Sequence, residues 1–192
     1  MNTAFSMISL GFKKYNGSLV ASPYKTKMIT AGIIFGAADA FCQKVLEKSE
    51  DNTQKKFDFQ RCLNMVLIGS CMSAPINHLW YCKWASALVN KITTRAKLQP
   101  IVSTAADQLL LTPVTLSSFL FLNDYMKDFK SLKAAKNVRE KFWGGITTNW
   151  KIWPPIILAN FMFVPPPMRV LFVNTFGFFW TIYLSHLQNN TN

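Results

Sequence analysis

Five prolines divide the last third of the chain into two apolar segments of helical length. They are Pro154, Pro155, Pro165, Pro166 and Pro167. A helix in water loses a backbone hydrogen bond at each internal proline, whereas a membrane helix tolerates proline because neighbouring helices satisfy the freed groups. The prolines at 165–167 predict a hinge between segments 153–164 and 170–187. Each segment is shorter than the roughly 20 residues that span a bilayer, so the pair predicts one proline-broken span over 153–187, or a span followed by a re-entrant or surface helix.

Amphipathic aromatic residues stand near the ends of the apolar segments. Tryptophan and tyrosine are enriched where a membrane meets water, because one part of the ring is apolar and the other can bind water. The sequence therefore predicts an interfacial aromatic belt. Its candidates are Trp80, Tyr81, Trp150, Trp153, Trp180 and Tyr183.

Three further apolar stretches, near residues 28–46, 62–80 and 101–122, have the length of membrane helices. Half of all residues are hydrophobic, yet mean hydropathy is only +0.14, so these spans carry polar residues. We predict an all-α membrane helix bundle over 28–187 with about four transmembrane helices. A basic amphipathic segment, 1–27, precedes the bundle, and a polar tail, 188–192, follows it. Lysines at three-residue spacing within 124–141 predict a short helix lying at the interface.

The formal net charge of +12 comes from bases scattered through the connections between spans. Nucleic acid is not an expected partner, because the bases form no stripe along one face. Anionic lipid at the basic loops is expected instead. Residues 1–27 and 82–99 contain bases and no acid, and they share one side of the membrane if the spans alternate. The positive-inside rule then assigns that side to the matrix or the cytosol.

Several polar residues fall at membrane depth, where an ionisable side chain costs several kcal/mol unless it faces the protein interior or water. One interpretation is a polar path between the helices, with Arg169 as a fixed positive site for an anionic metabolite. The alternative is a buried ion network, in which Asp39, Asp107 and Arg169 lock the bundle together. Both remain open from the sequence. The set is Asp39, Gln43, His78, Asp107, Gln108, Asn160 and Arg169.

No catalytic arrangement, phosphate-binding loop or metal-ligand cluster is recognisable in the sequence. The two histidines are far apart, and the four cysteines form no C-x-x-C pair. An enzyme is not expected, and neither a cofactor nor a bound metal is predicted.

The spacing of the motifs resembles the Mpv17/PMP22 family of small four-span organelle membrane proteins. The C-terminal pattern N-W, W-P, N-F, V-P, R and W-x-x-Y-L-S falls on Asn149-Trp150, Trp153-Pro154, Asn160-Phe161, Val164-Pro165, Arg169 and Trp180 to Ser185. Earlier motif positions match at Tyr15, Leu19, Pro23, Thr26, Asp39, Gln43, Asp58, Arg61, Gly69, Pro75, His78, Trp80, Tyr81, Asp107, Gln108 and Pro113. The chain departs from the pattern where Ala38 and Ala74 replace glycines and Ile157 replaces a glutamine.

The resemblance implies a channel or a transport-linked protein for small metabolites. It also implies the mitochondrial inner membrane or, as the alternative, the peroxisomal membrane. The basic, acid-free N-terminal segment favours mitochondria. A non-catalytic accessory subunit of a larger, respiratory-type inner-membrane assembly is the rival interpretation, because the loss of the glutamine at Ile157 makes a conducting path less polar.

Overall fold

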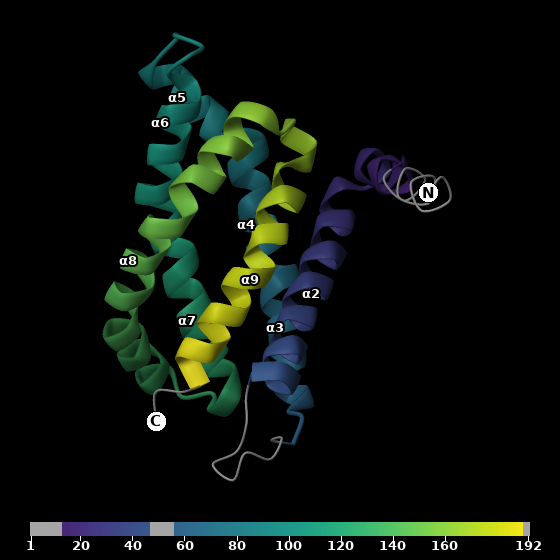
Figure 1. Ribbon diagram of the computed structural model, residues 1–192, viewed down its shortest axis with the longest axis vertical. Helices are drawn as coiled ribbons and strands as arrows, with labels where there is room; N and C mark the ends of the chain where they lie inside the picture. Colours follow the sequence, from purple (N-terminus) through teal and green to yellow (C-terminus); the bar gives the residue numbers. More distant parts are fainter. Residues whose placement is uncertain (1–12, 47–55, 190–192) are drawn as a thin grey trace.

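The computed structural model describes residues 13–46 and 56–189, and in these residues the chain is helical with no strand. Residues 13–21 form a helix that turns away from the bundle at the upper end of Figure 1. The other helices are α2 (Pro23–Phe41), α3 (Phe59–Leu67), α4 (Ala74–Leu79), α5 (Ala85–Ile92), α6 (Gln99–Ala106), α7 (Thr112–Asp128), α8 (Ser131–Phe163) and α9 (Arg169–Asn189).

Several of these helices are continuous with one another through wide π-helical turns. Pro75 and Pro113 follow two of these turns, and neither can donate the hydrogen bond that an α-helix would need there. The described residues thus form five long rods. The turns are η1 (Cys42–Leu46) after α2, η2 (Ile68–Ser73) and η3 (Trp80–Trp84) within the α3–α5 rod, and η4 (Asp107–Leu111) within the α6–α7 rod.

The five rods pack side by side in a closed ring (Figure 1). Helix α2 lies between α9 and the α3–α5 rod, and α8 packs against both α9 and the α6–α7 rod. The ring closes where α5 meets α6 and where α3 meets α7. Every rod therefore presents one face to the centre of the bundle.

The C-terminal region differs from the predicted pair of short segments. Helix α8 has 33 residues, which is about 50 Å at the rise of an α-helix. It contains Pro154 and Pro155 and ends at Phe163, and α9 runs back from Arg169 for 21 residues. The proline hinge thus joins two antiparallel helices, each long enough to cross the hydrocarbon core (Figure 1).

Residues 131–141 belong to α8 and form no separate interfacial helix. Helix α7 stops at Asp128 because Phe129 adopts a left-handed conformation, with φ 56°, and α8 starts two residues later. Buried positions recur every three or four residues along α8 from Ile146 to Ile157, and the partly buried Val138 and Phe142 continue the same face towards the buried Ala134. This face packs against neighbouring helices, and α8 continues through Gly144 and Gly145 without a break.

Small residues allow α2 and the α3–α5 rod to approach closely. A Cβ atom added to Gly36 would lie 2.6 Å from Val66 Cγ2, and one added to Gly69 would lie 2.8 Å from the carbonyl oxygen of Ala31. A Cβ atom on Gly32 would meet Ser70 Oγ and would lie 3.3 Å from Val66 Cγ1. These contacts agree with the close-packing function of small residues in membrane helices.

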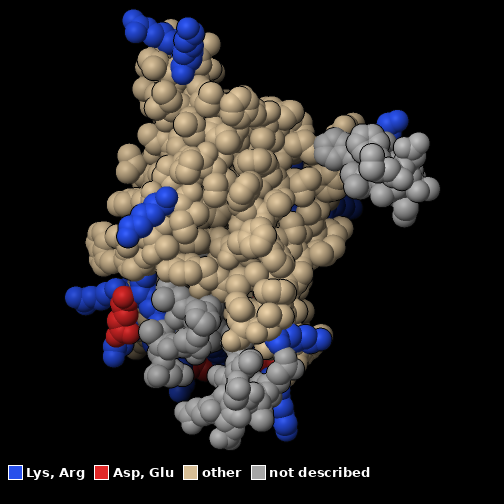
Figure 2. All heavy atoms as spheres, viewed as in Figure 1, with Lys and Arg blue, Asp and Glu red and all other residues tan. Residues whose placement is uncertain are grey.

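Charged side chains gather at the two ends of the molecule, and the band between them is mostly uncharged (Figure 2). Pro23–Leu46 and Gln99–Asp128 are each long and apolar enough to cross a membrane. Residues 13–27 and 82–99 lie at the same, upper end with the hinge, and their charged residues are all bases. The predicted all-α membrane bundle is confirmed, and its acid-free segments share one end as expected.

Candidate functional site

A cavity of about 110 Å³, lined by both apolar and polar residues, lies at the centre of the helix ring. All five rods contribute to its wall, with Phe35 from α2 and Ile157 from α8 among the apolar residues. One water molecule needs about 30 Å³ in the liquid, so the cavity has room for several. The polar wall residues are Ser73, Asn77, Tyr81, Asp107, Gln108, Thr112, Thr115, Asn149, Trp153, Asn174, Trp180 and Thr181.

Asp107 is the charged residue of this wall, and it is 2% exposed. The Tyr81 hydroxyl donates a hydrogen bond to Asp107 Oδ2 at 2.8 Å. The Gln108 amide donates to Asp107 Oδ1 at 3.0 Å. The carboxyl group is thus oriented by a tyrosine from η3 and a glutamine from its own turn, and it takes part in no ion pair within the described residues.

Other buried polar atoms of the wall have no hydrogen-bond partner among the described residues. They are Gln108 Oε1, Asn149 Oδ1, Trp153 Nε1 and Asn174 Nδ2. A buried polar atom without a partner costs about 1–3 kcal/mol. Such a concentration of unpaired donors and acceptors around one cavity indicates that a polar solute or water completes the bonding. The site thus presents both donors and acceptors at membrane depth.

Asp39 and Gln43 lie away from this cavity and fasten α2 to the start of α3. The Arg61 guanidinium binds Asp39 Oδ1 through Nε and Nη2, each at 2.8 Å. Gln43 donates to Asp39 Oδ2 at 2.7 Å and to the carbonyl of Asp58 at 3.0 Å, and it accepts from the Asp58 amide at 2.7 Å. Asp58 caps α3 by accepting from the Arg61 amide. These contacts form a structural clasp, which we call the α2–α3 clasp.

The partner of Asp39 is therefore Arg61, and no triad of Asp39, Asp107 and Arg169 exists. The sequence suggested that triad because Arg169 is the one Lys or Arg residue after Lys151. The fold separates these residues, because Asp39 lies at the lower end of α2 and Arg169 begins α9 at the hinge (Figure 1).

His78 lies near the upper end of the bundle against a buried lysine that the sequence did not single out. Lys27 Nζ is 2.8 Å from His78 Nδ1 and 3.3 Å from Cys82 Sγ. Lys27 is only 2% exposed, although it ends the segment 1–27 that the sequence predicted to be basic and amphipathic and to precede the bundle. The ring of Tyr24 covers the imidazole at a centroid distance of 4.1 Å.

Arg169 lies beside the hinge, in a second pocket that is separate from the central cavity. Its guanidinium donates to the carbonyl of Val164 at 3.0 Å and to that of Phe161 at 3.4 Å, and it lies 5.0 Å from the Phe161 ring centroid. It shares a pocket of about 150 Å³ with Ser86 and Asn90. Asn160 is fully buried, and neither atom of its amide has a partner within the described residues. Arg169 thus holds the end of α8 and is outside the central cavity.

The predicted aromatic belt divides between the core and the surface. Trp80, Tyr81 and Trp153 are 3–7% exposed and pack inside the bundle instead of at the lipid surface. Their rings fill the centre because the positions they occupy face neighbouring rods. Trp150 is 43% exposed and donates to the carbonyl of Gln108 at 3.2 Å. Trp180 lines the cavity and stacks on Tyr183.

The sequence-based set therefore separates into four places: the clasp, the Lys27–His78 contact, the cavity and the hinge. Only Asp107 and Gln108 of that set line the cavity. Sequence reasoning missed Asn77, Asn149 and Asn174 as wall residues. A signal was available for Asn174, which is the single amide side chain of the apolar stretch 170–183.

Three related proteins align with nearly the whole chain. A PXMP2/4 family protein 2 from Dictyostelium discoideum is 30% identical over 91% of this chain and 89% of its own length. A protein SYM1 from Saccharomyces cerevisiae is 33% identical over 90% of this chain and 87% of its own. Peroxisomal membrane protein 2 from Bos taurus is 28% identical over 86% and 83%.

No solved structure matches the fold significantly. The family model for the Mpv17 / PMP22 family matches residues 128–185, which include the hinge, Arg169 and the cavity wall of α8 and α9. With relatives of at least 30% identity over nine tenths of its length, the chain belongs to the Mpv17 / PMP22 family.

Proposed function

We propose that this protein is a non-catalytic channel or transport protein that lets small polar metabolites cross an organelle membrane through the central cavity. The observation that carries the proposal is the cavity itself, with unpaired polar atoms from three rods and the buried Asp107. A helix bundle that needed only rigidity would be more stable with apolar residues at these positions, since an unmatched buried polar group is costly.

The chemistry of the wall favours neutral or cationic solutes. Asp107 supplies a carboxyl group, and none of the described lysine and arginine residues lines the cavity. The unpaired amide atoms of Asn149 and Asn174 offer an acceptor and a donor, which suit hydroxyl and amide groups. Arg169 lies in a separate pocket and not on the cavity wall. The channel proposal therefore does not include Arg169 as a binding site for an anionic metabolite.

We propose the mitochondrial inner membrane as the location, with the peroxisomal membrane as the alternative. The basic, acid-free segment 13–27 supports the first, and the relative named peroxisomal membrane protein 2 supports the second. Recovery from purified organelles after carbonate extraction distinguishes them. The end of the bundle that carries residues 13–27 and 82–99 would face the matrix or the cytosol. Protease protection of an epitope inserted at Thr94 tests that orientation.

The accessory-subunit alternative has little support. It depended on Ile157 in place of a glutamine, and Ile157 lies on the wall of a cavity that still has a volume of about 110 Å³. Native gels after mild solubilisation keep this alternative testable, because comigration with a much larger complex would favour it.

The test is reconstitution into planar bilayers with a salt gradient. We expect wild-type protein to conduct with a preference for cations, and Asp107→Asn to reduce that preference because the carboxyl group of the wall is lost. Asn174→Leu should lower conductance by filling the cavity with an apolar side chain. Asp128→Asn is the matched control, since Asp128 lies at the end of α7, outside the cavity wall.

Unchanged conductance and selectivity in both cavity variants would place the path elsewhere. Wild-type protein that is folded and shows neither conductance nor flux of small solutes would refute the channel.

A further inference from the structure

An amine, an imidazole and a thiol meet at the upper end of the bundle, away from the cavity. Lys27 Nζ lies 2.8 Å from His78 Nδ1 and 3.3 Å from Cys82 Sγ. The three residues come from α2, α4 and η3. Neither the clasp nor the cavity uses them.

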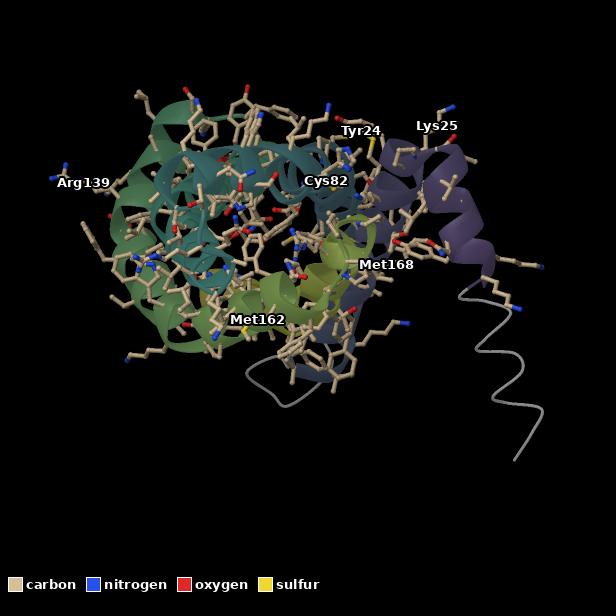
Figure 3. All side chains as sticks on the ribbon, turned by 90° about the horizontal axis from the view of Figure 1, so that it is seen from above. Tyr24, Lys25, Cys82, Arg139, Met162 and Met168 are labelled. Carbon is tan, nitrogen blue, oxygen red and sulfur yellow. The ribbon has the colours of Figure 1, made fainter. Side chains whose placement is uncertain are left out.

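The surroundings make this contact close and accessible at the same time. Lys27 is almost completely buried, so few other side-chain conformations are open to it. Cys82 is only partly buried. The Cys82 thiol also donates to the carbonyl of Pro166 in the hinge, at 3.6 Å. Figure 3 labels Cys82 and Met168 at this end of the bundle, and Lys25 points outward. Because Cys82 is partly exposed, a small oxidant can reach its sulfur, and the Lys27 amine lies 3.3 Å away.

We propose that Lys27 and Cys82 form a reversible covalent bond when the protein is exposed to peroxide. An oxidised cysteine sulfur, the sulfenic acid, condenses with a nearby thiol or nitrogen. Lys27 Nζ is a side-chain nitrogen 3.3 Å from this sulfur. The product is a sulfenamide, an N–S bond that joins residues 55 positions apart in the sequence.

The reaction proceeds in two balanced steps. The Cys82 thiolate attacks one peroxide oxygen; the S–O bond forms, the O–O bond breaks, and the departing hydroxide takes a proton from the Lys27 ammonium to become water. The free amine of Lys27, held beside His78 Nδ1, then attacks the sulfur. The N–S bond forms, the S–O bond breaks, and a second water leaves with a further proton from the amine. The sulfur is oxidised by two electrons, the peroxide is reduced, and the protein loses two hydrogen atoms.

The bond would change how the hinge is held. Sulfenamide sulfur has no hydrogen, so it cannot donate to the Pro166 carbonyl. Formation of the N–S bond also links α2 covalently to η3. The turn η3 contacts the hinge at the 3₁₀ turn η5 (Pro166–Met168). Oxidation therefore exchanges a contact between η3 and the hinge for a covalent link between η3 and α2.

The experiment is peptide mapping by mass spectrometry of purified full-length protein, treated with hydrogen peroxide and alkylated without reduction. We expect the peptide containing Lys27 to be joined to the peptide containing Cys82, with a combined mass lower by two hydrogen atoms, and the link to disappear after treatment with a thiol reductant. Lys27→Arg and Cys82→Ser should abolish the link. Lys25→Arg and Cys71→Ser are matched controls at exposed positions and should keep it.

A second measurement follows the sulfenic acid at Cys82 directly and does not depend on detecting the linked peptide. Dimedone traps sulfenic acids, so in Lys27→Arg the labelling of Cys82 should rise several-fold above wild type, because the competing amine is gone. Absence of the linked peptide in wild-type protein with oxidised Cys82 would overturn the proposal. Equal dimedone labelling of Cys82 in wild type and Lys27→Arg would overturn it as well, and so would Cys82 appearing only in disulfides.

Discussion

Asp39→Asn tests whether the α2–α3 clasp is structural. Asp39 is fully buried and the Arg61 side chain is 10% exposed, so the pair is shielded from water. Asparagine keeps the shape of the side chain and removes the negative charge to which the guanidinium binds. Gln43 also loses the acceptor oxygen that it binds at 2.7 Å whenever the new amide turns its nitrogen that way.

The magnitude follows from the contacts. Arg61 makes two hydrogen bonds to the carboxylate, and a hydrogen bond to a charged group contributes about 1.5–3 kcal/mol. Removal of one partner of a buried ion pair costs about 3–5 kcal/mol. Asparagine can still accept one bond from Arg61, so we expect the free energy of unfolding to fall by about 3 kcal/mol, at the lower end of that range.

The assay is reversible unfolding in mixed detergent micelles, followed by far-UV circular dichroism, with conductance measured in parallel. The double variant Asp39→Leu with Arg61→Leu is the matched control, because replacement of a whole buried pair by apolar residues is often neutral or stabilising. We expect it to regain most of the lost stability, and both variants that fold should keep wild-type ion selectivity.

Wild-type stability combined with altered selectivity in Asp39→Asn would refute this reasoning. Asp39 would then belong to the solute path and not to the clasp.

Further expected outcomes concern packing and the cavity. Gly69→Ala should lower the unfolding free energy measurably, because its Cβ would meet the Ala31 carbonyl oxygen at 2.8 Å. Gly144→Ala, in open space on α8, should instead raise it by up to about 1 kcal/mol through helix propensity; an equal effect of both changes would contradict the close approach of α2 and the α3–α5 rod. Ile157→Gln should raise single-channel conductance, because it adds an amide to the cavity wall; lower or unchanged conductance would contradict the assignment of that wall to the path.

Much of the fold could be predicted from the sequence because it rests on local physics. Apolar stretches of spanning length predict helices in any membrane, since backbone groups there must bond within the helix. Gly32 and Gly36 lie on one face by helical spacing alone, and the structure packs that face on Val66. The proline hinge at 165–167 also follows from the chemistry of the ring, which cannot continue the hydrogen-bonded ladder.

The start of α8 could not be predicted in the same way. Hydropathy favoured a short segment from Trp153, because Lys133, Lys136 and Lys141 make residues 131–141 polar. In the folded chain Ala134 and Ile146 pack on neighbouring rods, so the helix extends to Ser131 through tertiary contacts.

The sequence by itself determined that buried polar residues must find partners, because an unpaired charge in the membrane is too costly to leave alone. It did not determine which partners they find. Asp39 and Asp107 look alike in the sequence, each an acid in an apolar helix with a glutamine on its C-terminal side, four residues later for Asp39 and directly adjacent for Asp107. Asp39 meets Arg61 because α3 begins beside the end of α2, whereas Asp107 faces Tyr81 and the cavity. Partner choice depends on which rods are neighbours and how each is turned, and that arrangement minimises a sum of contacts over the whole chain, so only the tertiary structure decides it.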